Sequence, residues 1–205
     1  MADAGAPPPL YGLDIETDTA VDGLDPRVGR VLAVAVAHAD GVTVLDDASE
    51  AELLAGLDHH LARLDPGVLV TWNGARFDLP YLSTRARRRR VHLDLRLEVD
   101  PTRVHRCRPT GLDEPGYRAS WGRHRHLDVY RCYRADVGPA LRVACSLKSV
   151  AALVGLAPVK VDTARVHTLA PEALRAYVAS DAACPRELAR RRWANASAAV
   201  DRVRA

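Results

Sequence analysis

The sequence predicts an α/β domain built on one central mixed sheet, in which three antiparallel strands are followed by parallel ones and helices cover both faces. Two observations support this prediction. Apolar residues recur with the two-residue period of strands in the first part of the chain, and strand-like and helical segments alternate along the rest. The length of 205 residues suits one domain, because a chain of this size buries about 70% of its unfolded surface.

The strands are predicted from alternation and from turn residues. Leu13 and Ile15 alternate with Asp14 and Glu16, which is the period of a half-buried strand. The pair Asp40-Gly41 predicts a tight hairpin turn between the next two valine-rich runs. The expected strands are residues 10–16, 31–37, 42–45, 68–72, 92–99 and 127–130.

The helices are predicted from caps and apolar stripes. Ser49 and Glu52 form a capping box ahead of a leucine stripe, and Pro171 suits the first turn of the last helix. The expected helices are residues 49–64, 78–90, 146–154 and 171–193. Residues 100–125 are rich in Pro, Gly, Arg and His without any period, so we expect a long loop insertion there. The predicted organisation is a disordered tail at 1–9, the domain at 10–193 and a C-terminal tail at 194–205.

Composition excludes several classes of protein. There is no apolar run near the roughly 18 residues that a membrane span requires, and residues 1–10 lack the basic and apolar regions of a signal peptide. We therefore expect no membrane partner and a cytoplasmic location. The four cysteines show no C-x-x-C spacing, which argues against a disulfide framework. His105, Cys107, His124 and His126 form H-x-C and H-x-H pairs, which leave zinc as an alternative without any familiar finger spacing.

Charge is distributed unevenly along the chain. Residues 1–80 contain 4 Arg and Lys against 14 Asp and Glu, whereas residues 81–205 contain 25 against 12. This asymmetry suits a protein that gathers carboxylates at one place and presents cations to a polyanion at another. Arg85 and the run Arg87–Arg90 are candidate phosphate contacts, although arginines are also favoured at a helix end. Tyr117 and Trp121 are candidates for a platform that stacks single-stranded bases.

Asp14 and Glu16 stand two residues apart on the first expected strand, so both side chains point to one face with roughly 6.6 Å between their Cα atoms. Their repulsion is about 2.5 kcal/mol at an effective dielectric near 20. A fold avoids this cost unless a cation or a proton neutralises the pair, and a hard divalent metal is the natural cation. The alternative is an edge strand that exposes two acids to water.

Two further segments bring candidate residues. Asp78 follows Asn73 and a glycine turn at the start of a helix, where it is either a site residue or an N-cap. Tyr177 and Asp181 are spaced i, i+4 and share one helix face, although a core tyrosine and a surface acid would look the same. Asp128, on an expected strand, is a further candidate for a position near a metal site.

Taken in order, Asp14-Ile15-Glu16-Thr17, Asn73 to Asp78 and Tyr177 to Asp181 resemble the three motifs of the DnaQ-like 3′–5′ exonucleases. Tyr177 stands four residues before Asp181, and Ala176 occupies the position of the histidine of the histidine branch, so the resemblance is to the tyrosine branch called DEDDy. The flanking segments WNGARFDLPYLSTR, HLDVYR, SLKSVA and SDAACPREL resemble the exonuclease domain of family B DNA polymerases and its stand-alone bacterial relatives. The resemblance covers roughly residues 10–193, except that the segment 100–125 matches nothing in the family.

The resemblance implies an RNase H-like fold and a metal-dependent 3′–5′ exonuclease that releases nucleoside 5′-monophosphates from single-stranded ends. It implies DNA as the preferred substrate, because the resemblance is to a proofreading domain. An exoribonuclease, or a non-catalytic nucleic-acid-binding or polymerase-associated module, remains the alternative. By similarity two ions of Mg²⁺ or Mn²⁺ would be held by Asp14, Glu16, Asp78 and Asp181, Tyr177 would orient the attacking water, and Thr17, Asn73, Arg76 and Phe77 would contact substrate.

Overall fold

The computed structural model describes residues 7–46, 49–106, 113–134 and 144–201. Seven strands form one mixed sheet in the order β3-β2-β1-β4-β7-β6-β5. β1 is antiparallel to β2, and β2 to β3, whereas β1, β4 and β7 run parallel, which confirms the predicted mixed sheet. The strand bounds are β1 Leu10–Thr17, β2 Val31–His38, β3 Gly41–Leu45, β4 Val68–Thr71, β5 Leu95–Arg106, β6 Asp113–Trp121 and β7 His124–Asp128.

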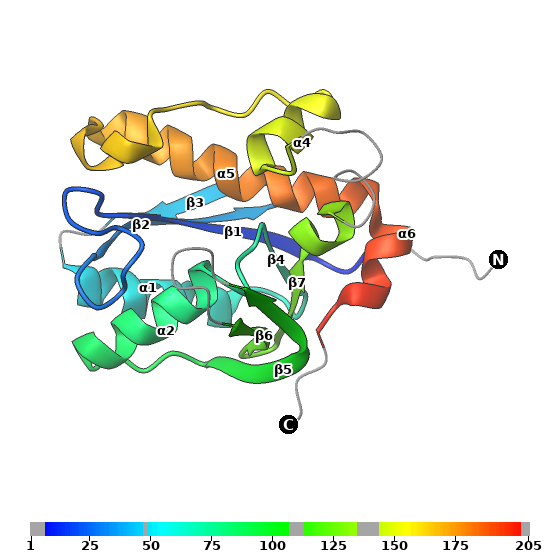
Figure 1. Ribbon diagram of the computed structural model, residues 1–205, viewed down its shortest axis with the longest axis horizontal. Helices are drawn as coiled ribbons and strands as arrows, with labels where there is room; N and C mark the ends of the chain where they lie inside the picture. Colours follow the sequence, from blue (N-terminus) through cyan, green and yellow to red (C-terminus); the bar gives the residue numbers. More distant parts are fainter. Residues whose placement is uncertain (1–6, 47–48, 107–112, 135–143, 202–205) are drawn as a thin grey trace.

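Helices lie on both faces of this sheet, as the sequence predicted (Figure 1). α1 and α2 pack beneath it, while α4, α5 and the helical residues 129–134 lie above β1 and β4 in the view of Figure 1. None of the described helices has both the length and the apolar character needed to cross a bilayer. The helix bounds are α1 Glu50–Arg63, α2 Asp78–Arg89, α4 Leu147–Leu153, η1 Thr163–Thr168, α5 Pro171–Arg191, α6 Trp193–Ala196 and η2 Ser197–Ala199.

The two faces of β1 carry the predicted alternation. Leu13 and Ile15 are buried in the core beneath the sheet, where they pack with the leucines of α1 and α2. The opposite face of β1 carries Asp14 and Glu16, which lie beneath α5. One face of this strand therefore stabilises the domain, and the other is free to carry polar chemistry.

α5 approaches the sheet closely because small residues face it. A Cβ at Gly12 would collide with the backbone carbonyl of Ala182, so only glycine fits there. The α5 face of β2 presents Ala33, Ala35 and Ala37, which pack against Val178 and Ala182 in a small core of their own. This close packing brings the Asp181 side chain down to the polar face of β1.

Residues 100–125, predicted to form an irregular loop, are instead mostly strand. β5 and β6 form a long antiparallel hairpin at the sheet edge, and β7 follows at once. The predicted stacking platform is also wrong, because Trp121, only 1% exposed, is buried and donates its indole N–H to Asp58, while Tyr117 is half-buried. The physical reason is that Arg, His and Gly residues occupy strand positions here, and a prediction based on apolar alternation assigns such residues to a loop.

The histidines of β7 do not form the suggested zinc site. His124 contacts the carbonyl of Leu61 at 2.8 Å and packs edge-on against Tyr11. His126 contacts Thr71 through Nε2 and Asp201 through Nδ1, so both of its nitrogens are engaged. The side chains of the other two candidates, His105 and Cys107, lie outside the described residues.

The C-terminal segment is docked on the sheet. Ala196, Val200 and Asp201 are buried, and the Asp201 carboxylate accepts bonds from Arg103 at 2.6 Å and from the backbone N–H of Ala119 at 3.0 Å. The ends of the chain that were predicted as tails lie partly outside the described residues, which begin at residue 7 and end at residue 201.

Candidate active site

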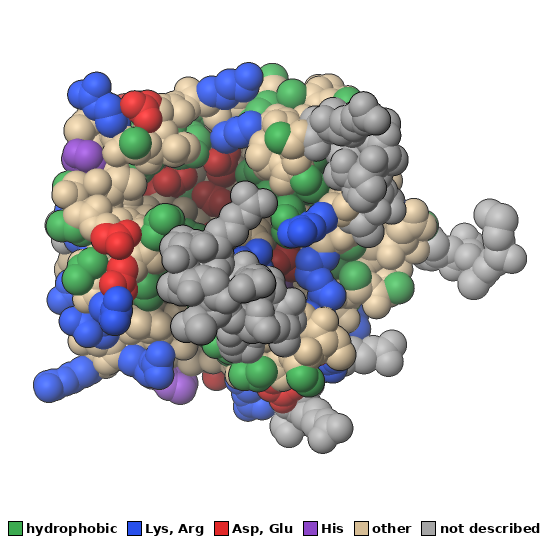
Figure 2. All heavy atoms as spheres, viewed as in Figure 1, with side chains coloured by type: hydrophobic (Ala, Val, Ile, Leu, Met, Phe, Trp, Pro, Cys, Tyr) green, Lys and Arg blue, Asp and Glu red, His purple; other side chains and the backbone are tan. Residues whose placement is uncertain are grey.

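A cleft of about 420 Å³ opens between β1, the start of α2 and the middle of α5. Figure 2 shows acidic side chains inside the hollow of this face, beneath the helices of its upper part. The cleft lies beyond the carboxyl ends of the parallel strands, which is where open α/β sheets place their ligands. It is lined by Asp14, Ile15, Glu16, Trp72, Asn73, Arg76, Phe77, Asp78, Tyr130, Cys145, Tyr177 and Asp181.

Three carboxylates converge in this cleft. One oxygen from each of Asp14, Glu16 and Asp181 lies within 4.8 Å of the others. β1 supplies the first two from alternate positions on one strand face, and α5 supplies the third. The spacing is short enough for a single cation to contact all three oxygens.

Asp78 joins them from the opposite side, carried by a turn that the sequence builds in a specific way. Asn73 adopts the left-handed conformation with φ of 64°, which asparagine tolerates better than most residues. A Cβ at Gly74 would overlap the side chain of Thr71, so the turn needs glycine. Asp128, at the end of β7, accepts bonds from the backbone N–H groups of Asn73 at 2.8 Å and Ala75 at 3.4 Å.

Asp128 therefore supports the turn and lies outside the lining of the cleft. The residue is 4% exposed, and its charge contributes to raising the pKa of Asp78. The sequence suggested a place near the metal site for Asp128. The structure gives its carboxylate a supporting contact with the backbone that delivers Asp78.

The acids of the cleft have raised pKa values, chiefly because they are withdrawn from water. Burial raises the pKa of Asp14 well above its usual value, and the charges of Asp78, Glu16 and Asp181 add to the effect. Burial and the charge of Asp181 raise the pKa of Glu16 to about 8. Burial raises the pKa of Asp78 to about 7, although backbone N–H groups oppose the shift. Close to neutral pH the cluster therefore favours binding either protons or a cation.

One cation of the chain already contacts the cluster. Lys148, the second residue of α4, forms an ion pair with Asp181, and its ammonium lies 4.5 Å from the centre of the Tyr177 ring. Burial raises the pKa of Asp181, and the bonds from Lys148 and from the Tyr177 hydroxyl act against that rise. The i, i+4 spacing predicted this contact between Tyr177 and Asp181.

Burial and the charge of Glu16 raise the pKa of Tyr177 far above its usual value, so its phenol stays protonated at any working pH. A protonated phenol can donate one hydrogen bond and accept another.

The four predicted substrate residues lie in different settings. Arg76 and Phe77 line the cleft, with Arg76 exposed and Phe77 half-buried against Tyr81. Asn73 also lines the cleft, and its side-chain oxygen is buried without a hydrogen-bond partner among the described residues. Thr17 is buried, and its hydroxyl donates to the carbonyl of Gly23 at 2.7 Å, so its predicted contact with substrate stays a prediction.

The sequence analysis missed two aromatic side chains and a lysine of this cleft. Trp72 and Tyr130 lie edge to face with ring centres 5.5 Å apart, and Arg134 covers the Tyr130 ring. Trp72 directly precedes the Asn73 motif, and Lys148 lies in the SLKSVA segment that carried part of the resemblance. The sequence segments around Trp72 and Lys148 were the only signals for these residues. Neither segment has an apolar periodicity or a pair of charged residues that would predict a side chain in a cleft.

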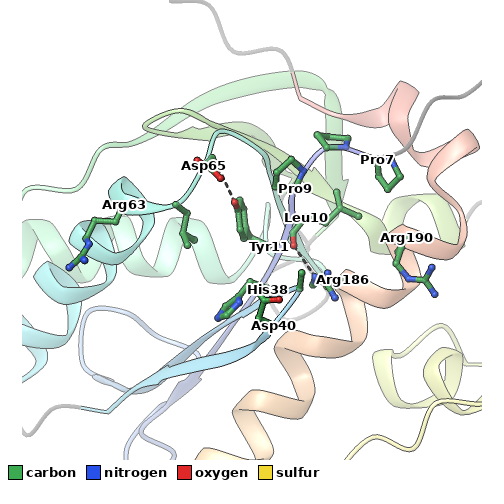
Figure 3. A pocket seen from close by; sticks show the side chains of 13 residues that line it. Pro7, Pro9, Leu10, Tyr11, His38, Asp40, Arg63, Asp65, Arg186 and Arg190 are labelled. Atoms are coloured by element: carbon green, nitrogen blue, oxygen red, sulfur yellow. Dashed lines mark hydrogen bonds between the residues drawn. The ribbon is translucent and has the colours of Figure 1, made fainter.

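A second hollow, larger at about 600 Å³, lies at the opposite end of β1 (Figure 3). Its walls hold cations and acids together: Arg63, Arg186 and Arg190 face the same space as Asp40 and Asp65. Arg186 is already engaged, because it donates to the carbonyl of Leu10 at 2.9 Å. The volume of a hollow is therefore a poor guide to the functional site here, because the smaller cleft contains the clustered carboxylates.

An α/β sheet that gathers carboxylates at the ends of parallel strands belongs with folds that bind divalent cations and phosphate esters. The family model of the DNA polymerase family B exonuclease domain matches residues 31–148, more than half of the chain. The chain belongs to this family and is a 3′–5′ exonuclease. The match includes the Asn73–Asp78 motif but neither the Asp14–Glu16 pair nor the Tyr177–Asp181 pair.

Two relatives place this membership in context. DNA polymerase 2 of Aeropyrum pernix is 34% identical over 102 residues, which is 45% of this chain and 13% of that polymerase. The family B DNA polymerase of Pyrobaculum calidifontis shares the fold with a TM-score of 0.67 at 22% identity, over 90% of this chain and 24% of that one. The chain thus spans only a small part of the length of the polymerases it resembles, and the structural match confirms the predicted fold.

Proposed function

We propose that this chain hydrolyses the 3′-terminal phosphodiester of single-stranded DNA and releases nucleoside 5′-monophosphates, with two divalent ions bound in the cleft. One observation carries the proposal: Asp14, Glu16 and Asp181 offer oxygens within 4.8 Å of one another, and among the described residues only Lys148 forms an ion pair with them. Clustered carboxylates without a matching cation destabilise a fold, so their retention is explained by a cation that binds there.

The donor set fits hard divalent metals. All four candidate ligands are carboxylates, which Mg²⁺ and Mn²⁺ prefer over the nitrogen and sulfur ligands of zinc. Asp14 would bridge two ions, Glu16 and Asp181 would hold the ion on the side of the attacking water, and Asp78 would reach the second. When bound, such ions activate a water for in-line attack and stabilise the departing 3′ oxygen.

The remaining polar groups of the cleft would handle the water and the phosphate. Tyr177 would hold the attacking water in line through its hydroxyl, because its raised pKa prevents it from acting as a base. Lys148 now pairs with Asp181, and metal binding to that carboxylate would leave its ammonium available for a phosphate oxygen. This pattern of four acids and one tyrosine corresponds to the DEDDy arrangement.

The walls of the cleft support a nucleotide as substrate. Trp72, Phe77 and Tyr130 line the cleft beside the acids, and base–aromatic stacking is worth about 1–3 kcal/mol per base without any sequence preference. The unpartnered Asn73 oxygen would accept a hydrogen bond from the terminal nucleotide. DNA is favoured over RNA because both relatives named above are DNA polymerases.

The test uses end-labelled single strands of DNA and RNA with Mg²⁺ or Mn²⁺, comparing the native chain with Asp14→Ala. We expect stepwise shortening from the 3′ end, faster on DNA, with 5′-monophosphates as product. Asp14→Ala should reduce the rate at least about a thousandfold, because each lost metal ligand removes several kcal/mol of transition-state stabilisation. Glu172→Ala, which removes an exposed acid that does not line the cleft, is the matched control.

Two results would reject the proposal. Equal activity of native and Asp14→Ala chains would show that the cleft is not the catalytic centre. Shortening that continues when the 3′ terminus is chemically blocked would show the wrong polarity.

A further inference from the structure

A second strongly charged feature lies at the far end of α2. A hollow of about 400 Å³ is lined by Arg27, Val28, Arg85, Arg88 and Arg89, which we call the arginine pocket. We propose that the arginine pocket binds backbone phosphates of the single strand that leads away from the terminal nucleotide in the cleft. The proposal rests on the proposed function, since it assumes a nucleic-acid strand in the cleft.

Two guanidinium groups of the arginine pocket are held in place from behind. Glu50 has a side chain only 4% exposed, and it accepts bonds from Arg85 at 2.6 and 2.7 Å and from Arg89 at 2.6 Å. The backbone N–H of Val31 adds a further bond to the same carboxylate at 2.8 Å. Arginines fixed in this way lose little side-chain entropy when they bind an anion, so the pocket is prepared for one.

The other two arginines of the arginine pocket, Arg27 and Arg88, are less fully neutralised by carboxylates than Arg85 and Arg89. Arg27 pairs with Asp25 at 2.7 Å, and Arg88 makes no hydrogen bond or ion pair with any residue that the structure describes. Hydrogen bonds from Arg27 lower the pKa of Asp25 to about 2, and the charge of Arg88 contributes, so Arg88 lies near that pair. Four guanidinium groups face the paired carboxylates of Glu50 and Asp25, with Asp22 also near Arg27, which leaves an excess of positive charge for an external anion.

Helix stability does not explain this concentration of arginine. One or two cations satisfy the dipole at a helix end, as Arg63 does at the end of α1. α2 ends with three consecutive arginines, Arg87 to Arg89, followed by Arg90 at the cap. Like charges three and four residues apart on a helix repel each other. A phosphate chain would relieve that repulsion, and phosphate is the anion whose geometry guanidinium groups match.

The arginine pocket is fixed relative to the cleft by one helix and one loop. α2 begins with Asp78 in the cleft, and Arg88 lies ten residues further, so about 15 Å separates them along the helix axis. The loop after β1 spans the same distance, since Thr17 bonds to Gly23 and Arg85 donates to the carbonyl of Pro26 at 3.0 Å. About four stacked nucleotides at 3.4 Å each would cover this distance.

The acidic hollow and a group of basic side chains lie on the same face of the molecule (Figure 2). Figure 2 shows the acidic hollow and, on the same face, basic side chains gathered at its lower left, where Figure 1 places the end of α2. The loop between them exposes Val21, Leu24 and Val28, which are 54%, 77% and 58% accessible to solvent. Apolar side chains beside a basic groove offer contact to bases without reading their sequence.

The mixed hollow of Figure 3 makes a useful contrast. It also contains arginines, but Asp40 and Asp65 share its walls, and two of its three arginines are bonded to Leu10 and Glu187. The remaining one, Arg63, is exposed in the last turn of α1. Arg63, like Arg88, lies in the last turn of its helix, and it lines a hollow at the opposite end of β1 from the cleft, which makes it the matched control.

The experiment compares Arg88→Gln and Arg88→Glu with Arg63→Gln and Arg63→Glu, using oligothymidylates of 3 and 16 nucleotides. For the 16-mer we expect KM to rise about threefold in Arg88→Gln and about tenfold in Arg88→Glu, with kcat unchanged. Hydrolysis of the 3-mer should stay within about twofold of native in all four variants, because three nucleotides fall short of the arginine pocket. Both Arg63 variants should match the native chain on both substrates.

Binding is measured separately from hydrolysis, by fluorescence anisotropy of a labelled 16-mer in EDTA over a range of salt. Loss of one phosphate contact should reduce the slope of log K against log salt by about 0.7 in Arg88→Gln. If the native chain binds the 16-mer but hydrolyses neither substrate, the proposed function fails while the arginine pocket is still tested by this slope.

Three results would overturn the inference. One is an equal change of 16-mer binding in the Arg88 and Arg63 variants, which would indicate general charge only. Another is an equal loss on the 3-mer and the 16-mer in Arg88→Glu, which would place the effect in the cleft. The third is unchanged KM and salt slope in both Arg88 variants, as a surface reserved for an acidic protein would give.

Discussion

The carboxylates of the cleft and those of Glu50 and Asp201 are all withdrawn from water, yet their surroundings differ. Each of the latter two accepts bonds from an arginine and from a backbone N–H, and their pKa values are lowered although burial alone would raise them. Asp14 and Glu16 have no arginine partner in the part of the chain that the structure describes, and their pKa values are raised. The difference separates acids that hold the fold together from acids kept available for an external cation.

The largest effect on stability is expected from Asp201→Ala. This carboxylate joins Arg103, His126 and the backbone of Ala119, so its removal leaves several buried donors without an acceptor. We expect a loss of about 3–5 kcal/mol in the free energy of unfolding, measured by urea denaturation. Glu172→Ala, an exposed acid, should change it by less than about 0.5 kcal/mol. A small effect of Asp201→Ala would mean that the C-terminal segment does not stabilise the sheet.

The next effect falls on catalysis and comes from Tyr177→Phe. Removing the hydroxyl deletes its hydrogen bond to Asp181 and the one that we propose it makes to the attacking water, and it leaves the four acids in place. We expect kcat to fall about 10- to 100-fold with little change in KM, because a hydrogen bond to a charged group contributes about 1.5–3 kcal/mol. Tyr133→Phe, whose hydroxyl donates to the carbonyl of Leu188 away from the acids, is the control and should keep its kcat. A tenfold rise in KM with kcat intact would instead assign Tyr177 to substrate binding.

The same contrast explains which parts of the molecule could be predicted from sequence. The alternation of Leu13 and Ile15 with Asp14 and Glu16 is a local signal, and so is the capping box that begins α1, where Ser49 accepts from the backbone of Glu52. The carboxylates that converge were found because each belongs to a short motif on one element. Which buried acids are paired with an arginine, and which are not, could not be found in this way. The pairing of Glu50 with Arg85 spans 35 residues, and nothing near either residue indicates it.

The hairpin of β5 and β6 was missed for a related reason. Part of its polar bonding depends on tertiary burial: Asp100, 2% exposed, forms ion pairs with both Arg103 and Arg118. These arginines read as loop or surface residues in a sequence, because burial of their partner is a tertiary fact. Trp72 and Tyr130 were missed because an aromatic beside an acid cluster looks like a core residue until the strands are placed.

The pH dependence of stability should oppose the usual trend for acids. In the metal-free protein, folding raises the pKa of Glu16 from 4.5 to about 8 and that of Asp78 from 3.8 to about 7. Between these values the folded state keeps protons that the unfolded state has released, so stability falls as pH rises from about 4.5 to 8. We expect the Tm measured by calorimetry in EDTA to drop by several degrees from pH 5 to pH 8. Mn²⁺ at pH 8 should restore it, since an ion that binds only the folded state raises Tm.

The smallest expected effect is the change in stability caused by Asp14→Asn. It distinguishes most directly between an acid that holds the fold together and an acid that is free to bind a cation. The change preserves shape and removes the charge that Asp78, Glu16 and Asp181 all repel. At pH 8 in EDTA we expect the variant to be more stable than the native chain by about 1–2 kcal/mol, which is about 2–8 °C in Tm for a domain of this size. Mn²⁺ should then raise its Tm less than it raises that of the native chain. A structural carboxylate such as Asp201 cannot behave in this way, because its removal leaves its positively charged partners buried without an acceptor. If Asp14→Asn is destabilised instead, Asp14 is a structural acid, and the main argument for a metal site is lost.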